Sequence, residues 1–307
     1  MKDLMMLYGV TLGKRYLKRE KDIFVEALAV YFSKLNYSVG VQGKQSPFSA
    51  LNDIVIGEIK SAKKIIVAAY DTPSRVLVPN YLYYPFNMKR NMRYENLNLL
   101  IKLFASCLLA VSAFFILRGF VQYELWLKTV AILVSLLLVL ITYFCLKEKG
   151  NIVNFNRNSA SIAVICAAAR EYKNKDVAFV LLDQCVNSYE GFKLLLEHID
   201  AESKEILMLE ALASGEELVL VNKGKTSVLS MMKNKEDLSI YEKAYDASSG
   251  GDNFMSLFPN ILYFGSGSNK NKQFVIKNTR SRKDCEVDMA RLETIGRVVL
   301  SYMKGGE

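Results

Sequence analysis

The stretch FVLLDQCVNSYEG, residues 179–191, places a thiol and several polar side chains directly after an apolar run. The run is typical of a buried strand, and the residues after it are typical of a turn that leads into a helix. Ligands bind at the carboxyl ends of strands in open α/β sheets, so a site is expected just past Leu182. Cys185 is a candidate nucleophile there, but no histidine stands in a motif that would activate its thiol. The stretch therefore predicts where a site would lie, but few of its side chains could act in catalysis.

Other reactive residue types are sparse. His198 is the only histidine and lies near a predicted helix end, where an imidazole compensates the helix dipole more often than it binds a metal. The five cysteines form no CxxC pair, so neither a disulfide framework nor a zinc ribbon is indicated, and reduced thiols in the cytosol fit best. GSGSNK, residues 265–270, lacks the context and the ending of a phosphate loop and is predicted to be a mobile surface loop. No cofactor is predicted.

The chain is basic, with forty Lys and Arg against thirty-one acidic residues and a formal charge of +9. Such a balance is typical of proteins that bind nucleic acid or an anionic membrane surface. No basic motif with interleaved aromatic residues is present, which argues against nucleic acid. With 51% hydrophobic residues, the 307-residue chain can also bury a substantial core.

Two apolar runs in the middle of the chain favour the membrane. Residues 99–117 contain a single charge, Lys102, and residues 129–146 contain none. Each run is long enough to cross a bilayer, and both are apolar on all sides, which favours a transmembrane hairpin over a pair of core helices. Tyr123 and Trp126 in the short connection suit the membrane interface.

The residues that flank the runs predict the orientation of the hairpin. More basic residues flank the two runs on their outer sides than lie in the loop that connects them. The positive-inside rule therefore puts the soluble part and both termini in the cytoplasm. No signal peptide is recognised at the start of the chain. The tyrosine-rich residues 72–90 are interpreted as a loop at the membrane surface. The predicted interface residues are Lys89, Arg90, Arg93, Lys147, Lys149, Tyr81, Tyr83 and Tyr84.

The rest of the chain alternates between helical and strand patterns. A helix is predicted over residues 22–36, followed by three strands before Asp71, and the pattern resumes after the hairpin with an Ala-rich helix from about Ser159 to Tyr172. Further strands and helices alternate up to a final helix from Met289 to Met303. This order predicts a three-layer α/β fold with a mixed sheet. We expect residues 1–88 and 151–307 to form one domain, interrupted by the hairpin at residues 89–150.

Five motifs in order resemble those of the M28 family of zinc-dependent aminopeptidases. LNDIVIGEIKSAKKIIVAAYDT, residues 51–72, is similar to a segment that ends in His-x-Asp, and RNSAS, residues 157–161, to the turn D-N-A-S-G. FVLLDQCVNSYEG is similar to F-V-x-F-D-A-E-E-x-G-x-x-G, and MLEA, residues 208–211, to N-x-D-M. NTRSR and VDMARL, residues 278–282 and 287–292, are similar to H-T-x-x-D and I-D-x-x-x-L. The resemblance implies the three-layer aminopeptidase fold.

The resemblance also implies where a pair of zinc ions would be held. The metal-binding positions of the family match Ala69, Arg157, Val186, Glu210 and Asn278, and only Glu210 retains a ligand atom of the expected kind. Cys185 matches the general-base glutamate and is a poor base for a water proton. Asp71 matches the aspartate that orients the first histidine. The resemblance therefore implies a degenerate site, with neither catalytic nor metal-binding residues.

Arg157 is the most informative of these replacements, because a guanidinium repels a divalent cation and stays protonated. We expect Arg157 to occupy the former metal position and to pair with Asp71 or Glu210, so that neither carboxylate is buried alone. The alternative is that Arg157 is a solvent-facing turn residue.

The sequence thus predicts a catalytically inactive, membrane-anchored relative of the M28 peptidases. Some metal-free relatives of this family are subunits of membrane complexes, so we expect a scaffold, recognition or accessory role with a transporter or membrane protease. The expected partners are membrane lipid, a membrane protein, and a peptide held in the former cleft. One alternative is an active aminopeptidase or peptide hydrolase with a rebuilt or metal-dependent site. Another is a carrier of lipid or small molecules that uses residues 81–86.

Overall fold

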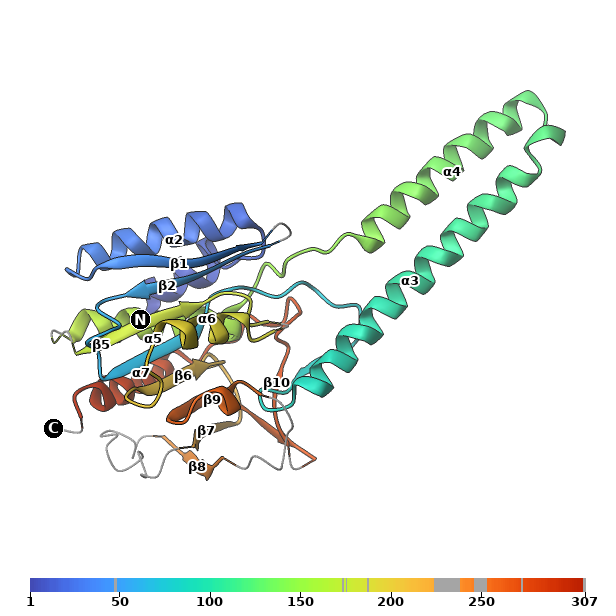
Figure 1. Ribbon diagram of the computed structural model, residues 1–307. Helices are drawn as coiled ribbons and strands as arrows, with labels where there is room; N and C mark the ends of the chain where they lie inside the picture. Colours follow the sequence, from blue (N-terminus) through green and yellow to red (C-terminus); the bar gives the residue numbers. More distant parts are fainter. Residues whose placement is uncertain are drawn as a thin grey trace.

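The computed structural model describes residues 1–46, 49–172, 174, 176–186, 188–223, 238–245, 253–271 and 273–305. Within these residues the chain forms an α/β body from which one long helical hairpin projects (Figure 1). The α/β body is built from both sides of the hairpin, because strands from before and after it interleave in the same sheet.

The sheet is mixed, and its centre is parallel. In the described residues it has ten strands, and the parallel pairs are β5 with β3, β3 with β6, and β6 with β9. The central strands are apolar and buried on both sides, as expected for a parallel sheet covered on both faces. The main order is β1 (Val39–Ser46), β2 (Ser49–Ile56), β5 (Val177–Leu182), β3 (Lys64–Ala69), β6 (Glu205–Glu210), β9 (Ile261–Lys270), β10 (Gln273–Lys277) and β4 (Leu82–Tyr83). Off this path, β7 (Glu217–Asn222) pairs with β9 and β8 (Ile240–Ala244).

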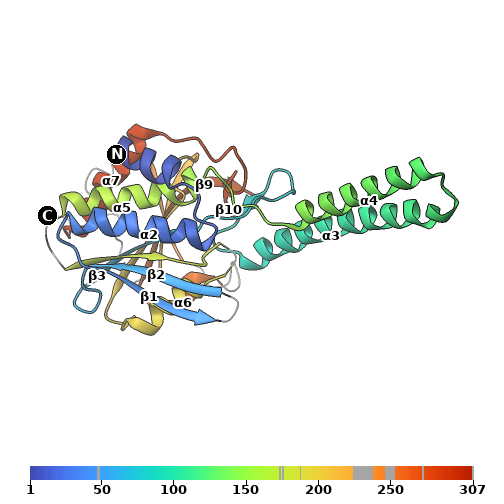
Figure 2. The ribbon, with the colours of Figure 1, turned by 90° about the horizontal axis from the view of Figure 1, so that it is seen from above.

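Helices cover the two faces of the sheet unequally (Figure 2). The Ala-rich helix α5 (Ala160–Glu171) is almost fully buried, because α2 (Lys18–Ser33) and α7 (Met289–Met303) pack in the same layer. Small side chains allow this close approach. The short N-terminal elements α1 (Lys2–Met5) and η1 (Met6–Thr11) join this layer. The opposite face carries α6 (Glu190–His198) and η6 (Phe254–Leu257).

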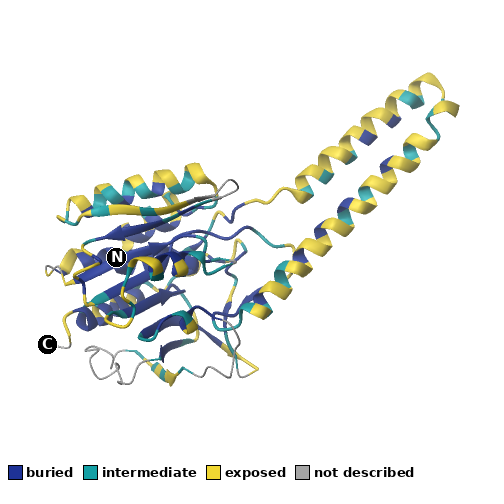
Figure 3. Cartoon of the chain, in the orientation of Figure 1, coloured by how far each residue is buried: buried dark blue, intermediate teal, exposed yellow. Residues whose placement is uncertain are grey.

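The hairpin consists of α3 (Met88–Arg118), the short turn η2 (Phe120–Gln122) and α4 (Leu125–Leu146). Both long helices are long and apolar enough to cross a membrane. Only 17% and 11% of their apolar windows are buried, and Figure 3 shows exposed residues along most of the hairpin. Helices in the core of a soluble protein would be mostly buried, so these two differ from core helices.

The base of the hairpin is fixed to the α/β body by polar contacts on three levels of α3. The Asn91 side chain accepts from the backbone N–H of Tyr84 at 2.9 Å and donates to its carbonyl at 2.8 Å. Glu95 forms an ion pair with Arg280, which also donates to Ser74. Further along, Asn98 accepts from the backbone of Leu77 at 2.8 Å. These contacts connect α3 directly to the segment that precedes it.

The fold class predicted from the sequence is confirmed, and the final helix has the predicted bounds. The prediction for GSGSNK was wrong, because these residues belong to β9. A Cβ atom at Gly267 would lie 2.6 Å from the Val275 carbonyl oxygen and 2.7 Å from the Phe274 ring, so a close approach requires glycine here. The glycines mark tight packing between strands rather than a loop.

Candidate functional site

The positions that match the family's site meet at one edge of the sheet. Strands β5, β3 and β6 are parallel neighbours, so their carboxyl ends lie together. Ala69 ends β3, Glu210 ends β6, and Cys185 and Val186 follow β5. The structure therefore brings together four of the seven predicted positions through strand order alone.

Arg157 fills the centre of this edge. It lies in the short segment η3 (Phe155–Ser159), just before α5, and is only 2% exposed. Its Nη2 atom donates to the Cys185 carbonyl oxygen at 3.1 Å and lies 3.8 Å from Glu210 Oε1. The guanidinium also lies 3.7 Å from the ring centroid of Tyr83. Arg157 is therefore a buried charge that pairs with Glu210, and the alternative of a solvent-facing turn residue is wrong.

The electrostatics of the pair follow from burial. Burial raises the pKa of Glu210, and the positive charge of Arg157 acts against this increase. Burial lowers the pKa of Arg157, but Tyr83, Glu210, Tyr81 and Asp71 together raise it above its ordinary value, so the guanidinium stays protonated. Hydrogen bonding from Tyr263 and Tyr83 also lowers the pKa of Glu210, whereas Arg157 Nε has no hydrogen-bond partner among the described residues. The pair is thus compensated in charge and only partly satisfied in hydrogen bonds.

Tyr83 reaches this site from the segment that connects β3 to the hairpin. Its short strand β4 pairs with β10, with Tyr83 opposite Ile276. The prediction that Tyr81, Tyr83 and Tyr84 lie at the membrane interface was wrong: they are 8%, 5% and 3% exposed. Tyr81 packs near Arg280, and Tyr84 lies under Arg90, so each ring packs against a cation inside the protein. Tyr83 and Arg157 thus lie together at this edge, beside Glu210 and Cys185.

Asp71 has a structural role at the same edge. Its carboxylate accepts from the backbone N–H groups of Cys185 at 3.2 Å and Val186 at 3.3 Å. Burial and the charge of Asp183 raise the pKa of Asp71 to about 6, while Lys21 and Arg157 act in the opposite direction. Asp71 does not form the predicted ion pair with Arg157 but holds the turn after β5 in place.

Cys185 does not have the environment of a nucleophile. Its side chain is buried, and its Sγ atom donates to the Asp183 carbonyl oxygen at 3.3 Å. Burial and the charge of Asp71 raise the pKa of the thiol well above its ordinary value. A reactive cysteine needs the opposite shift. His198 lies at the end of α6, where its Nδ1 atom is 2.8 Å from the Leu194 carbonyl oxygen.

Asn278 lies in a different place from the other six positions. It follows β10 with a positive φ of 64° and lines a polar cavity of about 280 Å³ with Asn156 and Asp284. Among the described residues it forms no hydrogen bond with Arg157 or Glu210. Asn156 and Asp284 connect the cavity to the site, because Asp284 accepts from the backbone N–H groups of Asn156 and Arg157 at 2.8 and 3.2 Å.

These residues do not fit the zinc pair that the resemblance implies. Ala69 and Val186 have no ligand atoms, and the Glu210 carboxylate faces the Arg157 guanidinium. A zinc ion needs about four nitrogen, oxygen or sulfur donors, and a buried guanidinium opposes a dication. Among the described residues, no group of three His, Cys, Asp or Glu side chains could hold a metal.

The sequence reasoning missed a second charged cluster next to the site. Asp53 in β2 accepts from the backbone N–H of Asp183 at 2.8 Å, and Asp183 forms an ion pair with Lys21 of α2. Asp53 is fully buried, and its Oδ2 atom has no hydrogen-bond partner among the described residues. The signal was available in the sequence as an acidic residue within the apolar run NDIVIG.

Replacing Arg157 with methionine should lower the free energy of unfolding by about 3–5 kcal/mol, because Glu210 would be buried without its partner. The double variant Arg157→Met, Glu210→Gln should recover part of this loss. Arg170→Met, at an exposed position of α5, should change stability by no more than about 0.5 kcal/mol. Thermal unfolding of the detergent-solubilised chain measures all three. An unchanged melting temperature in the single variant would contradict the ion pair.

Asp53 should make the protein less stable as the pH rises. Burial and the charges of Asp183 and Asp71 raise its pKa from 3.8 to about 8, so between these values the folded state binds more protons than the unfolded state. Stability then falls with pH, by at most about 1.4 kcal/mol per unit. Asp53→Asn should therefore gain in melting temperature relative to the parent protein from pH 5 to pH 8. Asp22→Asn, at an exposed position of α2, should differ from the parent protein in melting temperature by the same amount at every pH. The same constant difference in Asp53→Asn would contradict the prediction.

The fold is similar to that of several solved enzymes, although no family model matches the chain and no curated protein sequence matches it. Porphyromonas gingivalis glutaminyl cyclase aligns with a TM-score of 0.57 and 11% identity, over 96% of this chain and 93% of that protein. Legionella pneumophila LapA aminopeptidase aligns with a TM-score of 0.54 and 7% identity, over 100% and 69%. Fimbriiglobus ruber glutaminyl cyclase gives 0.53 and 11%, over 99% and 92%. At these identities the likeness concerns the fold: the chain has the M28 peptidase-like fold that aminopeptidases and glutaminyl cyclases share.

Proposed function

We propose that this protein is a catalytically inactive, membrane-anchored member of this fold class. It serves as a scaffold, recognition or accessory subunit of a membrane complex of the transporter or membrane protease type. The observation that carries the proposal is the buried contact of Arg157 with Glu210 and Tyr83 at the sheet edge. A charged pair and an aromatic ring occupy the place where hydrolysis would need a metal and an activated water.

The hairpin supports the membrane part of the proposal. Its outer surface presents large apolar side chains along both helices, which is costly in water and favourable in lipid. The five basic residues predicted at the interface lie at its base: Lys89, Arg90 and Arg93 in the first turns of α3, and Lys147 and Lys149 just after α4. Two basic residues, Arg118 and Lys128, lie near the tip. This asymmetry favours a cytoplasmic α/β body.

The attachment of the hairpin supports a scaffold role. Asn91, Glu95 and Asn98 fix α3 to the body, and Glu148 contacts both Lys102 at 3.6 Å and the Tyr16 hydroxyl at 2.5 Å. A partner that packs against the hairpin in the membrane would therefore meet a body at a fixed distance and angle. A peptide in the former cleft would first have to displace Tyr83, so we place the partner contact on the hairpin and the outer surface of the body.

The orientation can be tested by cysteine labelling in intact cells. In a variant with serine at the exposed Cys107 and Cys285 and at the half-buried Cys145, Val121→Cys at the hairpin tip should react with a membrane-impermeant maleimide from outside. Ser203→Cys, on an exposed turn of the body, should react only after the cells are opened. Labelling of the body but not of the tip in intact cells would show that the topology is the reverse of the proposed one.

The function is tested by isolating the chain from native membranes under mild detergent after lysine cross-linking. We expect a stoichiometric membrane protein to be recovered with the full chain. Replacing the outward-facing Leu103, Phe104 and Leu136 with alanine should weaken recovery, since these exposed side chains would pack against the partner. A monomer without a companion, or hydrolysis of aminoacyl reporters that a chelator abolishes, would overturn the proposal. The second result would favour an active peptidase.

A further inference from the structure

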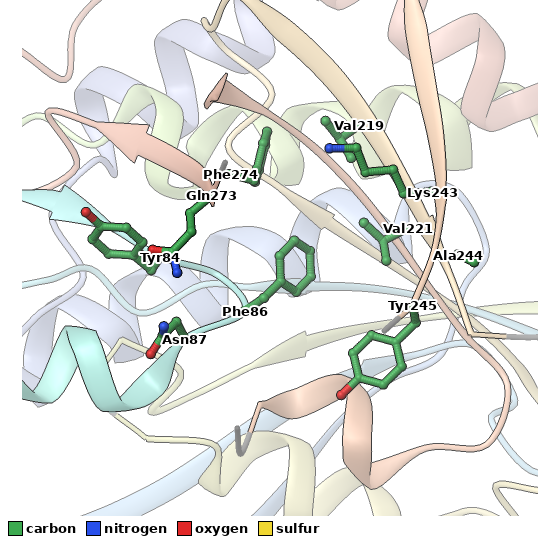
Figure 4. A pocket seen from close by; sticks show the side chains of 10 residues that line it. All are labelled: Tyr84, Phe86, Asn87, Val219, Val221, Lys243, Ala244, Tyr245, Gln273 and Phe274. Carbon is green, nitrogen blue, oxygen red and sulfur yellow. The ribbon is translucent and has the colours of Figure 1, made fainter. Parts of the chain in front are cut away.

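An apolar cavity of about 210 Å³ lies beside the base of the hairpin, and neither Arg157 nor Glu210 is among its lining residues (Figure 4). Three segments form its walls: the end of the connection from β3 to α3, strands β7 and β8, and the start of β10. Its lining residues are Tyr84, Phe86, Asn87, Val219, Val221, Lys243, Ala244, Tyr245, Gln273 and Phe274. Figure 4 shows the Phe86 ring between the polar side chains of Asn87 and Gln273 and the residues of β7 and β8.

The apolar wall is pre-formed by aromatic rings that pack against one another. Phe86 packs against Tyr263 with ring centroids 4.8 Å apart, and also against Phe254 and Phe274 at 6.4 and 6.3 Å. Val219 and Val221 belong to the buried centre of β7. A ligand entering this cavity would therefore meet fixed apolar surface and would not need to order it first.

The charge around the cavity has one sign. Lys243 contributes an ammonium group that has no hydrogen bond or ion pair to any residue the structure describes. Arg90 contacts two lining residues: it donates to Gln273 Oε1 at 2.7 Å, and its guanidinium lies 4.4 Å from the Tyr84 ring centroid. None of the described residues that line the cavity carries a carboxylate. An apolar interior with cations at its rim fits a ligand that has an apolar arm and a negative head.

The position of the cavity indicates where such a ligand would come from. Asn87 lines the cavity and caps α3, accepting from the backbone N–H of Arg90 at 3.0 Å. The apolar run of α3 begins at Leu99, which is about 18 Å further along the helix than Asn87 at 1.5 Å per residue. If the hairpin spans the bilayer, the cavity therefore opens within about three helical turns of the headgroups.

We propose that this cavity binds a single-chain anionic amphiphile, a medium-chain fatty acid or a similar lipid-derived carboxylate. Its chain lies against Phe86, Phe274 and Val221, and its head lies near Lys243. The cavity volume equals that of about seven water molecules at ~30 Å³ each, so a short acyl chain fits and a diacyl lipid does not. The proposal needs the hairpin in the membrane for supply of the ligand, but it does not depend on the scaffold role or on catalytic inactivity.

The test uses the full chain in lipid nanodiscs and two photoreactive probes, an eight-carbon fatty acid with a mid-chain diazirine and the matching alcohol. Adducts are located by peptide mass spectrometry, and apparent affinities come from competition with unlabelled octanoate or octanol. We expect the acid probe to label the peptides that contain Phe86, Tyr245 or Phe274. Ala244→Trp, at an exposed lining position, should abolish these adducts for both probes.

Charge variants separate specific binding from partition into lipid. Lys243→Gln should weaken the acid about tenfold and leave the alcohol unchanged, whereas Lys243→Arg should restore binding of the acid. Lys18→Gln, an exposed lysine on α2, is the matched control and should have no effect. Adducts confined to residues 99–146, cavity adducts that persist in Ala244→Trp, or equal losses in Lys243→Gln and Lys18→Gln would each overturn the proposal. Thermal unfolding confirms that each variant is folded.

Discussion

The buried charge of Arg157 is the constraint on which the organisation of this site depends. A guanidinium that is 2% exposed cannot lose its proton and must be balanced inside the protein. Glu210 supplies the opposite charge, the Cys185 carbonyl oxygen accepts a hydrogen bond, and the Tyr83 ring covers the guanidinium. These three partners come from β6, the turn after β5, and β4. One side chain therefore joins the strand ends that a metal pair would join in a peptidase of this fold.

Tyr83 links this site to the hairpin, because β4 lies in the short connection between β3 and α3. The same connection contains Tyr84, whose backbone N–H and carbonyl groups both bond to the Asn91 side chain of α3. It also contains Phe86, which forms part of the wall of the apolar cavity. The filled sheet edge, the base of the hairpin and the cavity are thus parts of one continuous structure. A force on the hairpin would therefore reach the Arg157 site through a few residues.

Burial explains why some residue roles were predicted correctly and others were not. The pairing of Arg157 with Glu210 followed from the rule that buried carboxylates need compensation, and it required only that the two positions meet. The tyrosines beside the hairpin were assigned to the membrane interface because aromatic residues next to a span usually lie there. Each ring instead packs against an arginine of the protein: Tyr81 against Arg280, Tyr84 against Arg90 and Tyr83 against Arg157. Arg280 is far from Tyr81 in the chain, so no local sequence pattern predicts the contact between them.

The sequence by itself determined the alternation of strands and helices, the two apolar runs, and the absence of metal-binding atoms in the side chains of Ala69 and Val186, because these depend on residue type and local period. The tertiary structure decided which carboxylate pairs with Arg157, why Gly265 and Gly267 belong to a strand, and that Asp53, Asp183 and Lys21 form a second charged cluster. The physical reason is that charge compensation and close packing join residues far apart in the chain. Their partners are chosen by strand order and burial, which sequence spacing does not record.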